Sequence, residues 1–150
     1  MDPVFVERVT AFAERLGPCP VAEPDAALEW LAQHVPFDGP DVAELRRLAL
    51  AGAEAGWLLP KQNGAIRFGR VAKDAHGFSV DAVWMDTPGP RHRHPNGEID
   101  LCFAVDGDPR FDGRPEGWTV YGPDSAHVPT VTGGTMLILY FLPGGAIEFG

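Results

Sequence analysis

Apolar residues recur every three or four positions over the first third of the chain, a spacing that places them on one face of an α-helix. The pattern predicts three helices, over residues 3–16, 24–35 and 40–55. Each begins at a proline next to an aspartate, a pairing suited to the first helical turn. All three predicted helices are amphipathic, so we expect them to cover another layer of the structure.

From Trp57 onwards the pattern changes to short runs rich in β-branched and aromatic residues, separated by glycine and proline. We predict six strands, over residues 66–72, 78–86, 98–105, 118–122, 135–142 and 146–149. Short strands without alternating helices favour a β-sandwich or barrel over a parallel α/β sheet. The predicted fold is a single, mainly β domain over residues 1–150, in which an N-terminal helical segment (1–56) packs against a small β-barrel (57–150).

The predicted strand 98–105 has one apolar and one polar face, because side chains alternate along a strand. The apolar face carries Ile99, Leu101, Phe103 and Val105, and the other carries Glu98, Asp100, Cys102 and Ala104. We expect the second face to line the barrel interior, because it carries two carboxylates next to a histidine pair. The apolar face then needs cover, either from the helices or from a second subunit in a homodimer.

The candidate chemistry lies between Gly89 and His127. His92 and His94 are one residue apart, so their imidazoles point the same way on an extended chain, and Glu98 and Asp100 have the same parity. A third imidazole, His127, follows a Gly-Pro turn. Three imidazoles and a carboxylate form a set of nitrogen and oxygen ligands that suits first-row ions such as iron, manganese, nickel or zinc.

Composition and charge narrow the possible functions. The 150 residues carry a net charge of −9 and no basic run, so the charge pattern of a nucleic-acid-binding protein is missing. No apolar run is long enough to span a bilayer, and the N-terminus does not resemble a signal peptide. Two cysteines make a poor disulfide framework, so we expect a cytoplasmic protein that does not associate with membranes.

The spacing H-x-H-x3-E from His92, with a later G-P-x3-H ending at His127, resembles the cupin superfamily over residues 65–149. That resemblance implies a barrel (a double-stranded β-helix) holding one metal ion on His92, His94, Glu98 and His127. The glycine that ends the first motif falls two residues late, at Gly107, so Asp100 remains an alternative carboxylate ligand. Whichever of Glu98 and Asp100 does not bind the metal is the candidate general acid or base.

A narrower resemblance covers most of the chain, including the helical N-terminus. Four segments are similar to the 4-hydroxylaminobenzoate lyase family: residues 68–72, 77–84, 94–103 and 122–130. The family implies conversion of 4-hydroxylaminobenzoate to protocatechuate with release of ammonia, in nitroaromatic breakdown. The same ligands would serve an iron dioxygenase acting on an aromatic substrate, or a cupin that binds a small molecule without catalysis.

A substrate of this kind is a small aromatic carboxylate. We expect an arginine to bind its carboxylate, because the guanidinium group can donate two parallel hydrogen bonds to a carboxylate. The candidates are Arg67, Arg70, Arg91 and Arg93, with Arg70 first because it lies in a segment shared with the resembled family. Aromatic residues that could stack on the ring are Trp84, Phe103, Tyr121 and Tyr140, the two tyrosines being favoured because their hydroxyls need partners.

Overall fold

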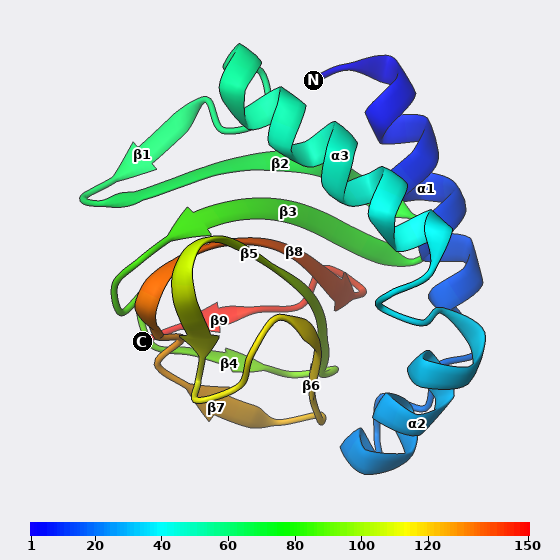
Figure 1. Cartoon of the computed structure of the whole chain (residues 1–150). Coiled ribbons are helices and arrows are strands. Elements are labelled where there is room, and N and C mark those ends of the chain that lie inside the picture. The colour runs from blue at the N-terminus through cyan, green and yellow to red at the C-terminus, as the bar shows by residue number, and fades with distance from the viewer.

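The computed structural model describes all residues from 1 to 150 and places three helices ahead of nine strands (Figure 1). The helices are α1 (Pro3–Leu16), α2 (Pro24–His34) and α3 (Pro40–Ala55). Asp2 caps α1 by accepting a 2.8 Å hydrogen bond from the Val4 amide, and Gly56, at φ +91°, ends α3. The three predicted helices are therefore confirmed, and proline opens each of them.

The strands form two antiparallel sheets that face each other as a flattened barrel (Figure 1). The six-stranded sheet has the order β1-β2-β3-β8-β5-β6, and the three-stranded sheet has the order β7-β4-β9. Their bounds are β1 (Lys61–Asn63), β2 (Ile66–Ala75), β3 (Phe78–Met85), β4 (His92–His94), β5 (Glu98–Phe111), β6 (Gly117–Tyr121), β7 (Ser125–His127), β8 (Val131–Pro143) and β9 (Glu148–Phe149).

The observed strands differ from the predicted ones in number and length. Strands β1, β4 and β7 were not predicted, because three residues are too few to show an alternating pattern. Strands β5 and β8 are longer than predicted and pair over most of their length, with irregularities after Ala104 and Gly107. Glycine is needed at this irregularity: Gly107 has φ +68°, and a Cβ there would lie 2.5 Å from the Gly133 oxygen.

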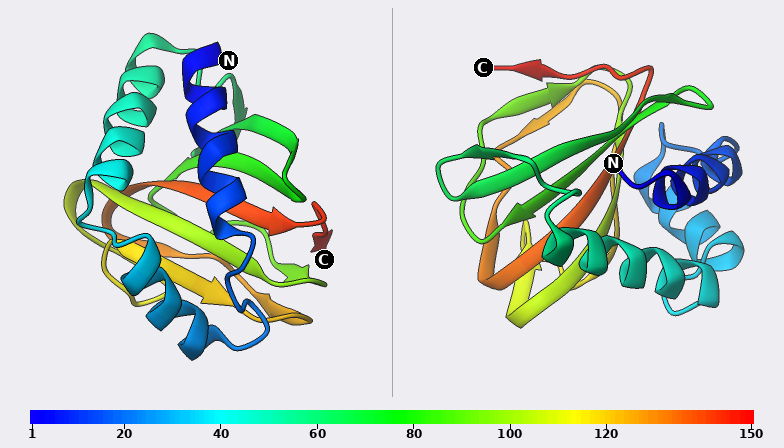
Figure 2. Two further views of the ribbon diagram at one scale, coloured as in Figure 1. Left: turned by 90° about the vertical axis from the view of Figure 1, so that its right-hand side faces the viewer. Right: turned by 90° about the horizontal axis from the view of Figure 1, so that it is seen from above.

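The helices pack on the outer face of the six-stranded sheet (Figure 2). Ile99, Leu101 and Phe103 of β5 are fully buried in a core that also contains residues of all three helices. The indole of Trp118 ties β6 to the end of α2 through a 2.8 Å hydrogen bond to the Val35 oxygen. Helices therefore cover the apolar face of β5, which leaves the predicted homodimer without the apolar surface that suggested it.

A second, smaller core lies inside the barrel, between the two sheets. It consists of Met85, Cys102, Phe111, Val131, Met136, Ile138 and Tyr140. Cys102 and Tyr140 thus lie on the inner face of the six-stranded sheet, as the alternation along β5 predicted for Cys102. The predicted fold class, a mainly β chain whose cupin-like barrel packs against N-terminal helices, is confirmed by this arrangement.

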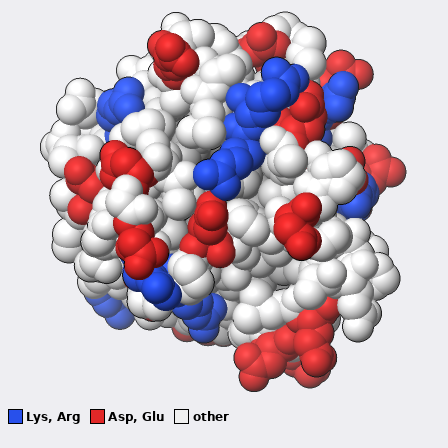
Figure 3. All heavy atoms as spheres, in the orientation of Figure 1, with Lys and Arg blue, Asp and Glu red and all other residues white.

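Charged groups on the surface are mixed in sign. On the face shown in Figure 3, a short stripe of basic side chains crosses the region of α3, with acidic side chains on both sides of it. Acidic residues outnumber basic ones, 21 to 12, over the whole chain. None of the helices is long and apolar enough to cross a lipid bilayer.

Candidate metal centre

The histidines and the glutamate named from the sequence meet between the two sheets. Strands β4 and β7 pair with His92 opposite His127, so both imidazoles lie on the same face of the small sheet. The turn at Gly97 then leads into β5, whose first residue is Glu98. Only glycine fits this turn, because φ is +87° and a Cβ would lie 2.8 Å from the Tyr121 oxygen. One ligand atom from each of His92, His94, Glu98 and His127 lies within 4.8 Å of all the others.

The distances in this cluster fit a shared metal ion. The Nε2 atoms of His92 and His127 are 3.2 Å apart, and Nε2 of His94 is 3.0 Å from a Glu98 oxygen. The other distances to Glu98 are 3.8 Å from His92 and 3.9 Å from His127. Metal–ligand bonds of about 2.0–2.2 Å separate neighbouring ligand atoms by roughly 3–4 Å. The donor set therefore has the spacing that a transition metal requires.

Burial supports the same interpretation. The side chains of His94 and Glu98 are 0% and 1% exposed, and that of His127 is 13% exposed. Although Nε2 of His94 and Oε2 of Glu98 are 3.0 Å apart, their orientation is wrong for a hydrogen bond, and both atoms lack a partner. Unpartnered buried polar atoms are costly and rare. A cation between these two atoms would satisfy both of them.

Each imidazole is held through its other nitrogen. Nδ1 of His92 is 3.2 Å from the Pro90 oxygen, and Nδ1 of His94 is 3.0 Å from the Ser125 hydroxyl. Nδ1 of His127 is 2.7 Å from a carboxylate oxygen of Asp112. Such outer contacts fix the orientation of metal-binding histidines. Burial lowers the pKa of His92, which is opposed by the Glu98 carboxylate, so burial favours the neutral, metal-binding form of this imidazole.

Sequence reasoning missed Asp112. It follows the last residue of β5 and precedes Gly113, so it has the sequence environment of an ordinary turn residue. Its approach to His127 depends on the β5–β8 pairing and on a left-handed backbone at φ +49°. Burial raises the pKa of Asp112, but hydrogen bonds from His127, Tyr121 and the Thr130 amide outweigh it and leave the pKa below its usual range.

Asp100, the alternative carboxylate ligand, lies on the same face of β5 but outside the cluster of four. It is fully buried, and neither of its oxygens has a hydrogen-bond partner. Burial and the neighbouring Glu98 carboxylate raise the pKa of Asp100 well above its usual value. The geometry thus separates the two acids: Glu98 faces the three imidazoles, and Asp100 is a second buried acid beside them.

Both tyrosines named from the sequence lie on the inner side of the barrel. The Tyr121 ring is stacked on His94 at 5.4 Å and lies 4.3 Å from the His127 ring, and its hydroxyl donates to Asp112. Burial, and then the Asp112 carboxylate, raise the pKa of Tyr121. Tyr140 pairs with Asp100 across β8 and β5, and its hydroxyl lies 3.8 Å from the Met85 sulfur.

The sheet register places Arg70 on this inner face as well. Directly paired residues share a face, and the pairs Asp100–Tyr140, Tyr140–Asp81 and Asp81–Arg70 form one row across β5, β8, β3 and β2. Nε of Arg70 is 2.6 Å from the Asp81 carboxylate, and the Arg70 side chain is 55% exposed. Its guanidinium is therefore at the open end of a polar row that leads to Asp100.

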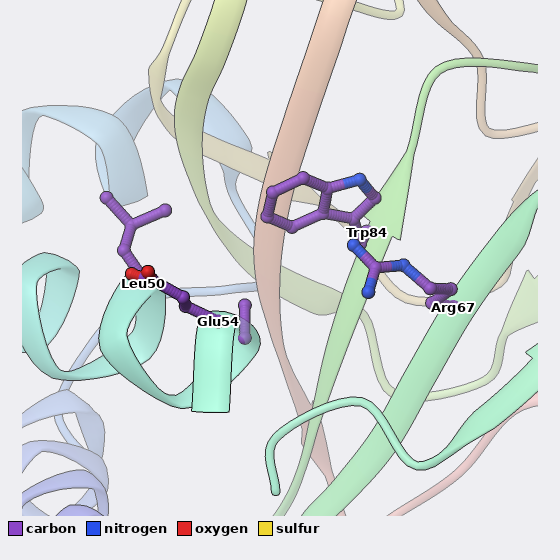
Figure 4. A pocket seen from close by; sticks show the side chains of 5 residues that line it. Leu50, Glu54, Arg67 and Trp84 are labelled. Atoms are coloured by element: carbon purple, nitrogen blue, oxygen red, sulfur yellow. The ribbon is translucent and has the colours of Figure 1, made fainter. Parts of the chain in front are cut away.

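Trp84 lies on the opposite face of the sheet from the histidines, and the structure therefore does not bring this candidate to the site. Its partner across β2 is Arg67, whose guanidinium carbon lies 4.7 Å from the centre of the indole ring. The two side chains line a groove of about 450 Å³ against Leu50, Ala53 and Glu54 of α3 (Figure 4). This groove is on the helix side and contains none of the four clustered residues.

The other candidates named for substrate binding also lie away from the cluster. Phe103 is buried under the helices, where it contacts Phe37 and Arg46. Arg93 points away from its histidine neighbours and binds Asp124 and Glu148 at the surface. Arg91 donates a 2.5 Å hydrogen bond to the Gly150 oxygen. Among the four arginines, only Arg70 has a register position on the inner face of the large sheet.

Comparison with known proteins finds relatives that share one description. A 4-hydroxylaminobenzoate lyase from Pseudomonas putida is 26% identical over an alignment of length 141, and the match covers 80% of this chain and 80% of that protein. Another from Nocardioides sp. (strain LMS-CY) is 33% identical over an alignment of length 91, and the match covers 55% of this chain and 54% of that protein.

Among solved structures, the DMSP lyase DddQ from Ruegeria pomeroyi DSS-3 covers 98% of this chain and 96% of its own, with a TM-score of 0.52 at 13% identity, which shows a shared fold. An RmlC-like cupin protein from Ralstonia eutropha JMP134 covers 61% of this chain and 72% of its own, with a TM-score of 0.44 at 14% identity. The sequence model of the family described as "PnbB: 4-hydroxylaminobenzoate lyase" matches residues 8–149. Because that match spans nearly the whole chain, this protein belongs to the 4-hydroxylaminobenzoate lyase family.

Proposed function

We propose that this protein is a metal-dependent lyase that converts 4-hydroxylaminobenzoate to protocatechuate (3,4-dihydroxybenzoate) with release of ammonia. The observation that supports this most is the convergence of three imidazoles and one carboxylate inside the barrel of a chain that belongs to this family. The overall reaction takes up one water, releases one ammonia and needs no oxidant. A dioxygenase that used the same site would consume oxygen, so oxygen uptake distinguishes the two reactions.

In this proposal the Nε2 atoms of His92, His94 and His127 and an oxygen of Glu98 hold a divalent iron, manganese, zinc or nickel ion. Nitrogen and oxygen ligands accept most first-row metals, so the ligand set does not choose among them. When bound, the metal would act as a Lewis acid on the hydroxylamino group. The two unpartnered buried atoms, Nε2 of His94 and Oε2 of Glu98, support a cation at this position.

The substrate is held by residues on the inner face of the barrel. Arg70 binds its carboxylate, because an exposed guanidinium lies at the end of the row that leads to Asp100. To do so it exchanges part of its contact with Asp81 for the substrate. The rings of Tyr121 and Tyr140 flank the aromatic ring, since both lie on the inner face beside the acids. Trp84 has no part in this proposal, because it faces the helices.

Asp100 is the group that we assign to proton transfer. It is buried beside Glu98, and neither of its oxygens has a hydrogen-bond partner outside this pair of acids, which supports a role in proton transfer to a bound substrate. Its task is to give a proton to the hydroxyl oxygen as the N–O bond breaks, so that water leaves. The resulting carboxylate can then accept a proton from the water that attacks the ring. A second water hydrolyses the ring imine that results, which breaks the C–N bond, releases ammonia and leaves a net uptake of one water.

The test is an anaerobic assay of ammonia and protocatechuate, together with the metal content of the purified protein. Replacing both His92 and His94 with Ala should abolish metal content and turnover together, whereas replacing the exposed His34 with Ala should change neither. Full activity in a metal-free double variant would rule out the proposal. Oxygen uptake during turnover would indicate a dioxygenase, and substrate binding without chemical change would indicate a non-catalytic binding protein.

A further inference from the structure

Asp112 makes an unusually complete set of contacts beside the metal centre. One carboxylate oxygen accepts hydrogen bonds from Nδ1 of His127, at 2.7 Å, and from the Tyr121 hydroxyl. The other accepts a 2.9 Å hydrogen bond from the Thr130 amide, and the Asp112 amide donates in turn to the Thr130 oxygen at 2.8 Å. The side chains of Asp112 and His127 are only 20% and 13% exposed, so water competes little with these contacts.

The contact with His127 fixes the position of a proton. A neutral imidazole carries one N–H, and an ionised carboxylate can only accept, so the proton of His127 lies on Nδ1. Nε2 then keeps its lone pair, and it is this nitrogen that lies 3.2 Å from Nε2 of His92 and 3.9 Å from Glu98. The opposite tautomer would place an N–H against the other ligands.

We propose that Asp112 is a positioning residue that holds His127 in the tautomer and orientation needed to bind the metal. The inference rests on the proposed metal site, and it assigns to Asp112 the orientation of His127, one of the metal ligands of that site. The same carboxylate anchors Tyr121, whose ring is stacked against His94. Asp112 thus stabilises two side chains that surround the centre, from a turn in which its own backbone is left-handed.

The turn itself does not require an aspartate. A left-handed backbone suits glycine or asparagine as well. An asparagine, however, has only one acceptor oxygen, and its amide group would face a donor at either position, the Thr130 amide or the His127 ring. Asp124 is a useful contrast: it is also left-handed, at φ +63°, but its side chain is exposed and binds Arg93 at the surface.

The experiment compares wild type, Asp112→Asn, Asp112→Gly and, as the matched control, Asp124→Asn. The first measurement is the affinity for Mn²⁺ or Zn²⁺, by competition with a chelator. Loss of an outer contact of this kind weakens metal binding about 10- to 100-fold. We expect that loss in both Asp112 variants, and less than about a twofold change in Asp124→Asn, because its side chain touches no ligand. Asp112→Gly keeps the turn, so a weakened affinity there is not due to backbone strain.

The second measurement reads the tautomer directly in metal-free protein at about pH 8, where an ordinary histidine is neutral. Long-range ¹H–¹⁵N correlations should place the His127 proton on Nδ1 in wild type, and that preference should be lost in Asp112→Asn. A proton on Nε2 in wild type, or wild-type metal affinity in Asp112→Asn, would overturn the inference. A wild-type protein that binds metal with the expected tautomer but does not transform the substrate would overturn only the proposed reaction.

Discussion

Replacing Glu98 with Gln should stabilise the protein without metal and destabilise it with metal. Glu98 is 1% exposed, and its Oε2 atom has no hydrogen-bond partner. The buried Asp100 lies beside it on the same strand face, so the metal-free fold holds two neighbouring acids out of water. Gln has nearly the same shape and cannot ionise, so the variant buries one acid fewer than wild type in the metal-free fold.

The size of this effect follows from the cost of an unpartnered buried group. Such groups cost about 1–3 kcal/mol, more when charged. We therefore expect Glu98→Gln to raise the free energy of unfolding of the metal-free protein by about 2 kcal/mol. In a chain of this length 1 kcal/mol shifts Tm by roughly 2–4 °C, so the midpoint should rise by about 4–8 °C.

Bound metal should reverse the order of stability, so that wild type becomes more stable than Glu98→Gln. A metal present at a thousand times its Kd stabilises the folded state by about 4 kcal/mol, which corresponds to a rise in Tm of roughly 8–16 °C for wild type. Glu98→Gln loses the only anionic ligand of the cluster, so its own rise should be much smaller. Wild type should then unfold at the higher temperature with metal, and the variant at the higher temperature with a chelator.

The assay is thermal unfolding of both proteins, with excess chelator and with excess Mn²⁺ or Zn²⁺. Glu148→Gln is the control, because Glu148 is an exposed glutamate paired only with Arg93, and its replacement should shift Tm little under either condition. The reasoning is refuted if Glu98→Gln is less stable than wild type in chelator, or if metal stabilises the two proteins equally.

Four further outcomes are expected. Replacing Arg70 with Ala should raise KM for 4-hydroxylaminobenzoate about 10- to 100-fold with little change in kcat, because hydrogen bonds to a charged group contribute about 1.5–3 kcal/mol. The same replacement should leave KM for phenylhydroxylamine, which lacks the carboxylate, unchanged. Equal effects on both substrates would contradict the role of Arg70. Replacing Phe141, which is fully buried between the helices and the sheet, with Ala should lower the free energy of unfolding in urea by about 3–5 kcal/mol, and a loss below about 1 kcal/mol would contradict the packing. Burial raises the pKa of Cys19 to about 11, and burial together with Asp100 raises that of Cys102 well above its usual value, so neither thiol should react with a disulfide reagent at pH 8 until the protein unfolds. Because the unfolded Cys19 thiol ionises near pH 9 and the folded one near 11, stability should fall with rising pH across that range, and Cys19→Ser should make the fall shallower.

The helices were predictable from local patterns, whereas several strands were not. Each helix combines a proline start with an apolar stripe several turns long, so its signal accumulates over many residues. Strands β1, β4 and β7 have three residues each, and pairing with neighbours rather than their own sequence defines them. The apolar side of β5 was recognised, but only the packing shows that helices cover it. Dimerisation stays a prediction.

Site residues were predictable where their positions along one strand place them on the same face. They were not predictable where their approach depends on the pairing between different strands. His92, His94 and Glu98 share a parity over seven residues, so local geometry already suggested that they meet. Trp84 and Arg70 lie on strands whose two faces are both apolar or mixed, so the sequence does not show which face is turned to the barrel interior. Only the pairing of β3 with β8 identifies the inner face. Asp112 reaches His127 across 15 residues through a turn and a hairpin, and no local pattern reports that approach.

The most direct test of the central claim is a crystal of the protein grown with the metal that restores activity, with data collected at the absorption edge of that metal. The account predicts an anomalous peak about 2.0–2.3 Å from Nε2 of His92, His94 and His127 and from a Glu98 oxygen. An active crystal form with no peak among these four residues, or with its peak elsewhere in the molecule, would contradict it.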